Sequence, residues 1–301
     1  MMGGFPYSTS FLLLMRLLVF LVPLLIVFGC DRSNAPFSKG RPLGAVDARI
    51  PEASGLVASK VNPGFLWTHN DSGHPAEIFL IDTTGRVRLT CRLAGVANRD
   101  WEDIALGTGP DSTRSYIYIA DIGDNEAKYP VKILYRLEEP VLTEATEVEI
   151  TQFDTLFVKL DDGQRDTETI LIDPLQHGMY FLSKREDSVH FYKVNYPYEG
   201  DTLNARFRVK LPFHNIVAGE ISPDGTEVVI KDYDRIYYWK RPDGGPISKL
   251  LQTPFTELPY KREPQGEAFT FARDGAGFYT LSEKVKDRPA ELRFYERQPA
   301  N

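Results

Sequence analysis

The stretch Glu52-Ala-Ser-Gly-Leu56, followed by the aromatic segment that ends in Trp67-Thr-His-Asn-Asp71, decides the fold because the combination recurs along the chain. Comparable openings start at Glu102, Glu168, Glu220 and Glu267, at spacings of 50, 66, 52 and 47 residues. Each opening precedes further segments in which apolar and polar residues alternate, separated by Gly, Pro, Asp or Asn, as expected for strands and turns. Four antiparallel strands per repeat of about 40 to 50 residues are typical of a β-propeller.

The repeats predict an all-β, five-bladed β-propeller of four-stranded antiparallel blades. The last repeat ends after its third strand near Arg297, so we expect Leu43 to Ile50 to supply the missing outer strand and close the ring. The long second interval is attributed to an extended hairpin over Glu138 to Asp162. A six-bladed propeller and a two-layer β-sandwich are the alternatives, since regularly spaced strands occur in both.

Composition excludes several classes of protein. The 301 residues hold 35 Lys and Arg against 42 Asp and Glu, a net charge of −7, so the chain lacks the basic excess of a nucleic-acid-binding protein. Two cysteines and no Cys-x-x-Cys pair exclude a disulfide-rich scaffold and a thiolate zinc site. No glycine-rich phosphate loop or Gly-x-Ser-x-Gly elbow is present.

The N-terminal region reads as an export signal. Arg16 precedes an apolar run from Leu17 to Phe28, which is shorter than a spanning helix and fits a signal peptide over residues 1–29. Met15 is an alternative start to Met1. Val27-Phe28-Gly29-Cys30 resembles the lipobox of bacterial lipoproteins, which implies a lipid on Cys30 that anchors the protein to a membrane of the bacterial cell envelope. The alternative is a plain signal peptide cut nearby. We expect a tether over residues 30–42 and a single propeller domain over residues 43–301.

Carboxylates are expected to gather at one mouth of the central channel, because the innermost strand of every blade starts on the same face. Carboxylate and hydroxyl oxygens suit calcium, so we predict a Ca²⁺ site. The candidate ligands are Glu52, Ser54, Glu102, Glu168, Glu220, Ser222 and Glu267. The alternative is that each glutamate accepts backbone hydrogen bonds from the neighbouring blade.

A polar rim is predicted around the same mouth. Its residues are Asn70, Asp71, Trp101, Asp121, Asp124, Asn125, Glu283 and Lys284. The basic residues Lys184, Arg185, Lys231 and Arg235 are candidates for holding an anionic group, and His69 is a candidate general base. The alternatives are a solvated rim of mixed charge and a structural histidine.

Four segments carry a resemblance to known families. Glu52–Leu56, Asn98–Ala105, Ile119–Asn125 and Gly266–Phe271 resemble segments of bacterial secreted propellers grouped as SdiA-regulated or esterase-like phytase proteins. The glutamate in each repeat is also similar to the pattern of five-bladed calcium-activated nucleotidases (apyrases). That resemblance implies Glu52 or Ser54, Glu102, Glu168, Ser222 and Glu267 as calcium ligands.

Two functions follow as expectations. The first is a lipid-anchored binding module with a carboxylate-lined, calcium-binding channel that recognises a small anionic ligand or an envelope protein. The second is a calcium-dependent hydrolase of phosphoesters or related anionic esters.

Overall fold

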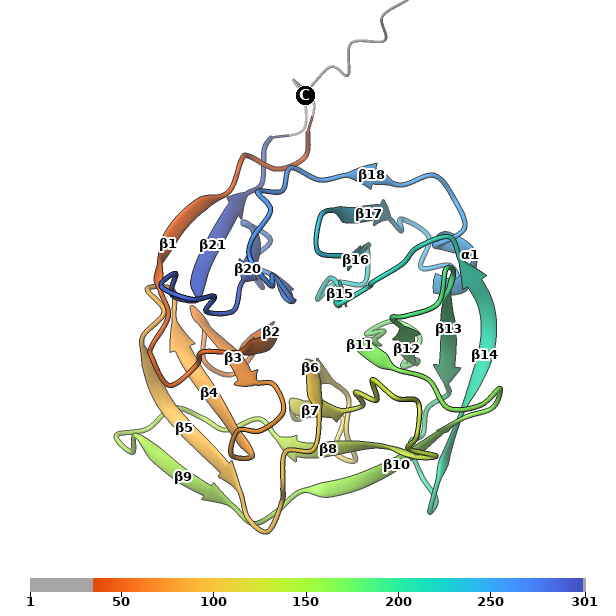
Figure 1. Ribbon diagram of the computed structural model, residues 1–301, viewed down its shortest axis with the longest axis horizontal. Coiled ribbons are helices and arrows are strands. Elements are labelled where there is room, and N and C mark those ends of the chain that lie inside the picture. The colour runs from red at the N-terminus through yellow and green to blue at the C-terminus, as the bar shows by residue number, and fades with distance from the viewer. Residues whose placement is uncertain (1–34, 300–301) are drawn as a thin grey trace, which may run out of the picture. The chain divides into compact units, whose positions relative to one another are not determined.

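The computed structural model describes residues 35–299, which belong to one unit of the chain, and its regular secondary structure consists of β-strands and one short helix. The predicted signal peptide and Cys30 lie outside the described residues. Figure 1 shows the strands grouped around a central axis, with β2, β6, β11 and β15 among the innermost. Within residues 35–299, no helix has the length and apolar character needed to cross a membrane.

One sheet begins near the N-terminus and has the order β2-β3-β4-β5-β9. Its strands are β2 (Ala53–Ala58), β3 (Phe65–Asn70), β4 (Glu77–Asp82), β5 (Val87–Leu93) and β9 (Glu147–Ile150). β2 to β5 are antiparallel neighbours, whereas β9 joins β5 in parallel. All six residues of β2 are buried, as expected for a strand at the centre of the molecule.

The largest sheet contains two four-stranded groups joined at their outer edges. The first group is β6 (Trp101–Gly107), β7 (Tyr116–Asp121), β8 (Lys132–Glu138) and β10 (Asp154–Leu160), and the second is β11 (Thr167–Ile172), β12 (Met179–Ser183), β13 (Val189–Val194) and β14 (Leu203–Leu211). Neighbours are antiparallel within each group. The parallel pairing of β10 with β14 joins the two groups.

The remaining strands form two four-stranded sheets. One contains β15 (Ala218–Ile221), β16 (Glu227–Lys231), β17 (Ile236–Lys240) and β18 (Thr256–Glu257), with the short helix α1 (Ile247–Leu250) between its last two strands. The other contains β19 (Ala268–Phe271), β20 (Gly277–Leu281), β21 (Glu291–Glu296) and β1 (Arg41–Ala45). β1 pairs antiparallel with β21, so the two ends of the described chain share one sheet.

Packing closes these groups into a cycle. The innermost strands contact one another in the order β2, β6, β11, β15, β19 and back to β2. The described residues bury their apolar side chains in five clusters, each formed between two neighbouring groups of strands. Sheets packed face to face around a shared axis are the arrangement of a β-propeller, so the described chain is an all-β protein with a propeller-like fold.

Two details of the sequence-based description need correction. Residues 138–162 do not form a hairpin, because β9 pairs with β5 and β10 pairs with β8 and β14. The segment is instead divided between the outer edges of two sheets. Phe37 falls in the predicted tether, but it is buried against Tyr238 and Phe278 and forms a bridge with Arg297.

Candidate functional site

Bulges near the start of three inner strands set the geometry of the candidate site. Ser54 in β2, Glu102 in β6 and Glu168 in β11 are each the extra residue where the pairing with the next strand shifts. A bulge re-aims the side chain of its extra residue. These three residues therefore occupy equivalent positions, and Glu52 lies two residues before that position.

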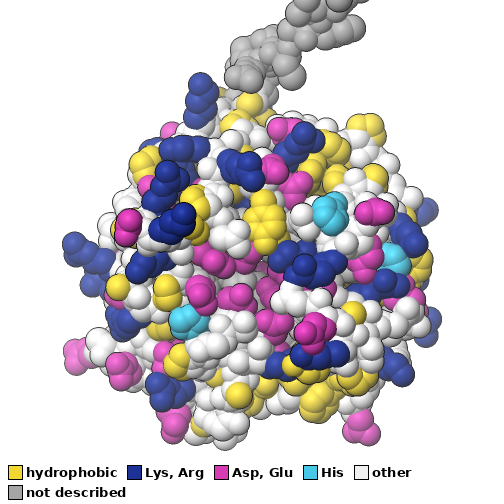
Figure 2. Space-filling view, in the orientation of Figure 1, with side chains coloured by type: hydrophobic (Ala, Val, Ile, Leu, Met, Phe, Trp, Pro, Cys, Tyr) yellow, Lys and Arg dark blue, Asp and Glu magenta, His cyan; other side chains and the backbone are white. Residues whose placement is uncertain are grey.

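Carboxylates gather around Glu102. Oxygens of Asp71, Asp100 and Glu102 lie within 4.8 Å of one another, and so do oxygens of Glu102, Asp166 and Glu168. We call these five residues the acidic mouth. Figure 2 shows Asp and Glu side chains concentrated at the hollow centre of this face. Because Glu102 belongs to both groups, the acidic mouth is one continuous array of oxygens that could hold a metal ion.

Asp100 and Asp166 were missed by sequence reasoning. Each stands two residues before a bulge glutamate, in Asp100-Trp101-Glu102 and Asp166-Thr167-Glu168. Side chains two residues apart on a strand project to the same face, so the repeated Asp-x-Glu pattern was a usable signal. Glu52 has the same offset from Ser54.

Two basic side chains balance part of this charge. Lys184 Nζ lies 2.9 Å from Glu168 Oε1, and Arg185 Nε lies 2.5 Å from Asp166 Oδ2. Among residues 35–299, no Lys or Arg forms an ion pair with Asp71, Asp100 or Glu102. The basic side chains that form ion pairs with the acidic mouth thus lie beside Asp166 and Glu168.

The pKa values in the acidic mouth are displaced upward. Burial and the neighbouring Glu168 raise the pKa of Glu102 well above its usual range. Burial raises the pKa of Glu168 to about 7 and that of Asp71 to about 6. Carboxyls with raised pKa values resist ionisation together unless a cation joins them, so a bound cation would stabilise this arrangement.

Three other predicted ligands lie beside the acidic mouth. The hydroxyl of Ser54 donates to the Glu102 carbonyl at 3.0 Å. Glu52 Oε2 lies 2.9 Å from His74 Nε2. Glu267 accepts a hydrogen bond from Tyr233, and its proximity adds to the burial that raises the pKa of Glu283 to about 8.

Glu220 and Ser222 do not join this group. Gly219 pairs with Ile230 as Thr169 pairs with Leu182, and Ala218 pairs with Lys231 as Thr167 pairs with Ser183. β15 therefore has no bulge and no residue equivalent to Glu168, and Glu220 pairs with Val229 as Ile170 pairs with Phe181. Aligning the repeats on their glutamates therefore displaced Glu220 by two residues. Glu220 and Ser222 line a cavity at the opposite ends of the inner strands.

Several predicted rim residues have structural roles. The Asn70 amide accepts from Glu52 N and donates to Arg49 O. Asp121 is buried beside Arg99, and Asp124 accepts from the backbone of Lys128 and Tyr129 and from Lys132. Trp101 is fully buried. Asn125 and Lys284 are exposed.

The catalytic candidates are scattered. His69 is fully buried with its ring edge-on to the ring of Trp101, and burial lowers the pKa of His69 to about 4. Lys231 is buried, donates to the carbonyls of Asp232 and Gly266, and has its pKa lowered to about 8 by burial. The exposed side chain of Arg235 lies 3.9 Å from Glu257. Only Lys184 and Arg185 of this set contact the acidic mouth.

No protein-family model and no curated protein matches the sequence. Matching solved structures include one described as a nidogen/laminin complex, at TM-score 0.45 and 14% identity, covering 76% of this chain and 72% of that chain. Another is described as the Dos1 propeller, at TM-score 0.39 and 12% identity, and the match covers 81% of this chain and 68% of that chain. A third is hydrazine synthase from Kuenenia stuttgartiensis, at TM-score 0.45 and 9% identity, and the match covers 85% of this chain and 98% of that chain. These likenesses carry no argument about function, and the family resemblances remain predictions.

Proposed function

We propose that the chain is a five-bladed β-propeller in which β1 completes the last blade. The closed cycle of five inner strands and the pairing of β1 with β21 support this arrangement. The burial of Phe37 moves the proposed start of the folded domain ahead of residue 43. The signal peptide over residues 1–29 and the lipid on Cys30 belong to the same proposal.

The acidic mouth is proposed to bind Ca²⁺. The observation that carries this proposal is Glu102, a buried carboxylate shared by two groups of acidic side chains and paired with no basic residue within residues 35–299. Calcium takes six to eight oxygen ligands in flexible geometry. Asp71, Asp100, Glu102, Asp166 and Glu168 supply carboxylate oxygens from three neighbouring groups of strands.

Ligand binding is the function that we propose for this centre. A bound Ca²⁺ would attract an anion, and Lys184 and Arg185 add positive charge on one side. The ligand would be a small anionic molecule or an acidic surface of an envelope protein. Anchored through Cys30, the domain would present this face from a membrane of the bacterial cell envelope.

The calcium-dependent hydrolase is the weaker proposal. Its candidate base, His69, is fully buried, and Lys231 and Arg235 point to other partners. A general base must come within hydrogen-bond reach of the proton that it removes. A binding module requires no such group.

Calorimetric titration with CaCl₂ tests the metal site. We expect one saturable site in the chain from residue 31 onward, which contains the whole described unit, and at least tenfold weaker binding in Glu102→Gln. Glu199→Gln changes an exposed glutamate outside the acidic mouth and should leave the affinity unchanged. The proposal fails if Ca²⁺ does not bind, or if both variants bind as the unmodified protein does.

A further inference from the structure

A cavity opens at the ends of the inner strands opposite to the acidic mouth. Leu106 and Gly107 at the end of β6, Ile172 at the end of β11 and Ile221 at the end of β15 line it, with a volume of about 230 Å³. We call it the basic pocket. Gly107 follows Glu102 by five positions, so at about 3.3 Å per residue the basic pocket lies at most roughly 16 Å along the strand from the acidic mouth.

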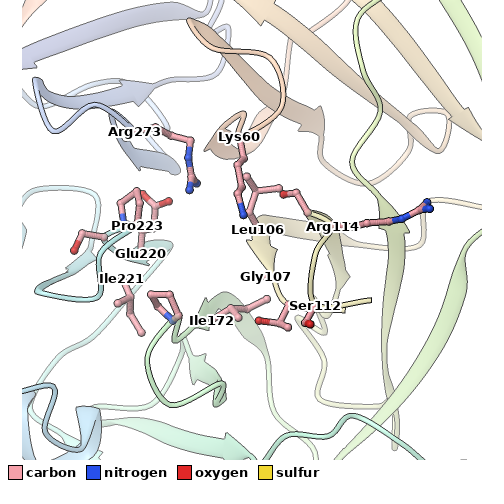
Figure 3. A pocket seen from close by; sticks show the side chains of 14 residues that line it. Lys60, Leu106, Gly107, Ser112, Arg114, Ile172, Glu220, Ile221, Pro223 and Arg273 are labelled. Carbon is pink, nitrogen blue, oxygen red and sulfur yellow. The ribbon is translucent and has the colours of Figure 1, made fainter. Parts of the chain in front are cut away.

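Two basic side chains enter the basic pocket. Figure 3 shows Lys60 and Arg273 directed toward its interior from two neighbouring groups of strands, whereas Arg114 points away. Arg114 forms ion pairs with Asp111 and Glu138. Within residues 35–299, neither Lys60 nor Arg273 forms an ion pair. Their charges are therefore available to a ligand.

The carboxyl of Glu220 lies at the same pocket but is already engaged. It accepts a hydrogen bond from the backbone N–H of Phe271. Burial raises the pKa of this carboxyl to about 8, and the nearby Arg273 opposes that shift. With Lys60 and Arg273 both at the pocket, the basic side chains outnumber this one carboxyl.

The rest of the lining combines apolar groups and hydroxyls. Leu106, Ile172, Ile221, Pro174 and Pro223 supply apolar surface. Thr108, Ser112, Ser115 and Ser222 add hydroxyl groups. Apolar walls with a few converging polar groups are typical of small-molecule sites, and this cavity is smaller than the roughly 300 to 1,000 Å³ of drug-sized sites.

We propose that the basic pocket binds a small organic carboxylate, with the carboxylate between Lys60 and Arg273 and a short hydrocarbon body against Leu106, Ile172 and Ile221. Lys60 and Arg273 both offer N–H donors, and a carboxylate has two oxygens to accept them. The apolar walls favour an anion with a hydrocarbon body over inorganic phosphate. This site is separate from the acidic mouth and does not depend on Ca²⁺.

Saturation-transfer NMR with isovalerate, acetate and inorganic phosphate tests the proposal. EDTA is present so that the acidic mouth holds no metal. Isovalerate should bind at least tenfold more tightly than acetate, because each fully buried CH₂ contributes about fourfold in affinity. Phosphate should bind more weakly than isovalerate.

Two variants locate the binding. Replacing Lys60 and Arg273 together by Gln should weaken isovalerate binding at least tenfold, and both side chains are exposed enough to be replaced without disturbing the core. Arg86→Gln removes an exposed cation outside the basic pocket and should leave the affinity for isovalerate unchanged. Absence of isovalerate binding at 10 mM, unchanged binding in the double variant, or tighter binding of phosphate would overturn the proposal.

Discussion

The negative charge of Glu102 is unfavourable in the folded protein. It is buried, belongs to both groups of the acidic mouth, and has its pKa raised by burial and by Glu168. Ionising it without a cation opposes folding, because a buried charge needs a partner. A metal ion bound at the acidic mouth would stabilise the charged form of Glu102, which belongs to both groups of carboxylates.

Glu102→Gln should therefore stabilise the metal-free protein. At pH 8 in EDTA we expect the free energy of unfolding to rise by about 1 to 3 kcal/mol, the usual cost of a buried polar group that lacks a partner. Urea denaturation followed by tryptophan fluorescence measures this change. A large loss of stability in EDTA would instead show that the Glu102 carboxylate makes necessary hydrogen bonds between neighbouring groups of strands.

At the scale of the element, strands were easier to predict than their register. The alternation of apolar and polar residues predicted further strands after each opening, and the structure has strands there, because this pattern reflects burial on sheet faces. Bulges in β2, β6 and β11 could not be read from single letters, since one extra residue changes which side chain faces the channel. Glu102 and Glu168 lie together because both are bulge residues. Glu220 lies on a strand without a bulge and faces the cavity at the other end of the inner strands.

β1 shows the other limit of sequence patterns. The closing strand was predicted over Leu43 to Ile50, whereas β1 spans Arg41–Ala45 and pairs with β21. The residues of β1 are partly exposed, so their pattern did not give its bounds. Phe37, just before it, packs edge-on against Phe278 at 5.0 Å between ring centres. The residues next to Phe37 in the sequence do not indicate such a contact, because its partner Phe278 lies in a distant part of the chain.

Phe37→Ala tests whether this segment belongs to the fold. We expect a loss of about 3 to 5 kcal/mol in unfolding free energy, as for other buried aromatic side chains. The control Phe255→Ala removes a side chain that is 43% exposed and should cost less than Phe37→Ala. Equal small losses in urea denaturation of the two variants would mean that residues 35–40 act only as a tether.

At the scale of the whole molecule, the acidic mouth and the nearby Glu283 make stability depend on pH. The folded-state pKa values of Asp71, Glu168 and Glu283 are raised to about 6, 7 and 8. The folded protein therefore binds more protons than the unfolded chain between about pH 4 and pH 8. In EDTA, this contribution to stability is present below about pH 4 and is lost as the pH rises through the folded-state values.

Chemical denaturation in EDTA at pH 6 and pH 8 measures this dependence. The free energy of unfolding should be lower at pH 8, and Glu283→Gln should reduce the difference. Greater stability at pH 8 than at pH 6 in the unmodified protein would contradict the assignment of raised pKa values.

The most direct measurement is the melting temperature of the chain from residue 31 onward at pH 8, in EDTA and in excess CaCl₂. A cation that binds only the folded state adds about 2.7 kcal/mol at a concentration one hundred times its dissociation constant. For a domain of this size we predict a rise of roughly 5 to 10 °C, and little rise in Glu102→Gln. An unchanged melting temperature in saturating CaCl₂ would contradict a calcium site at the acidic mouth.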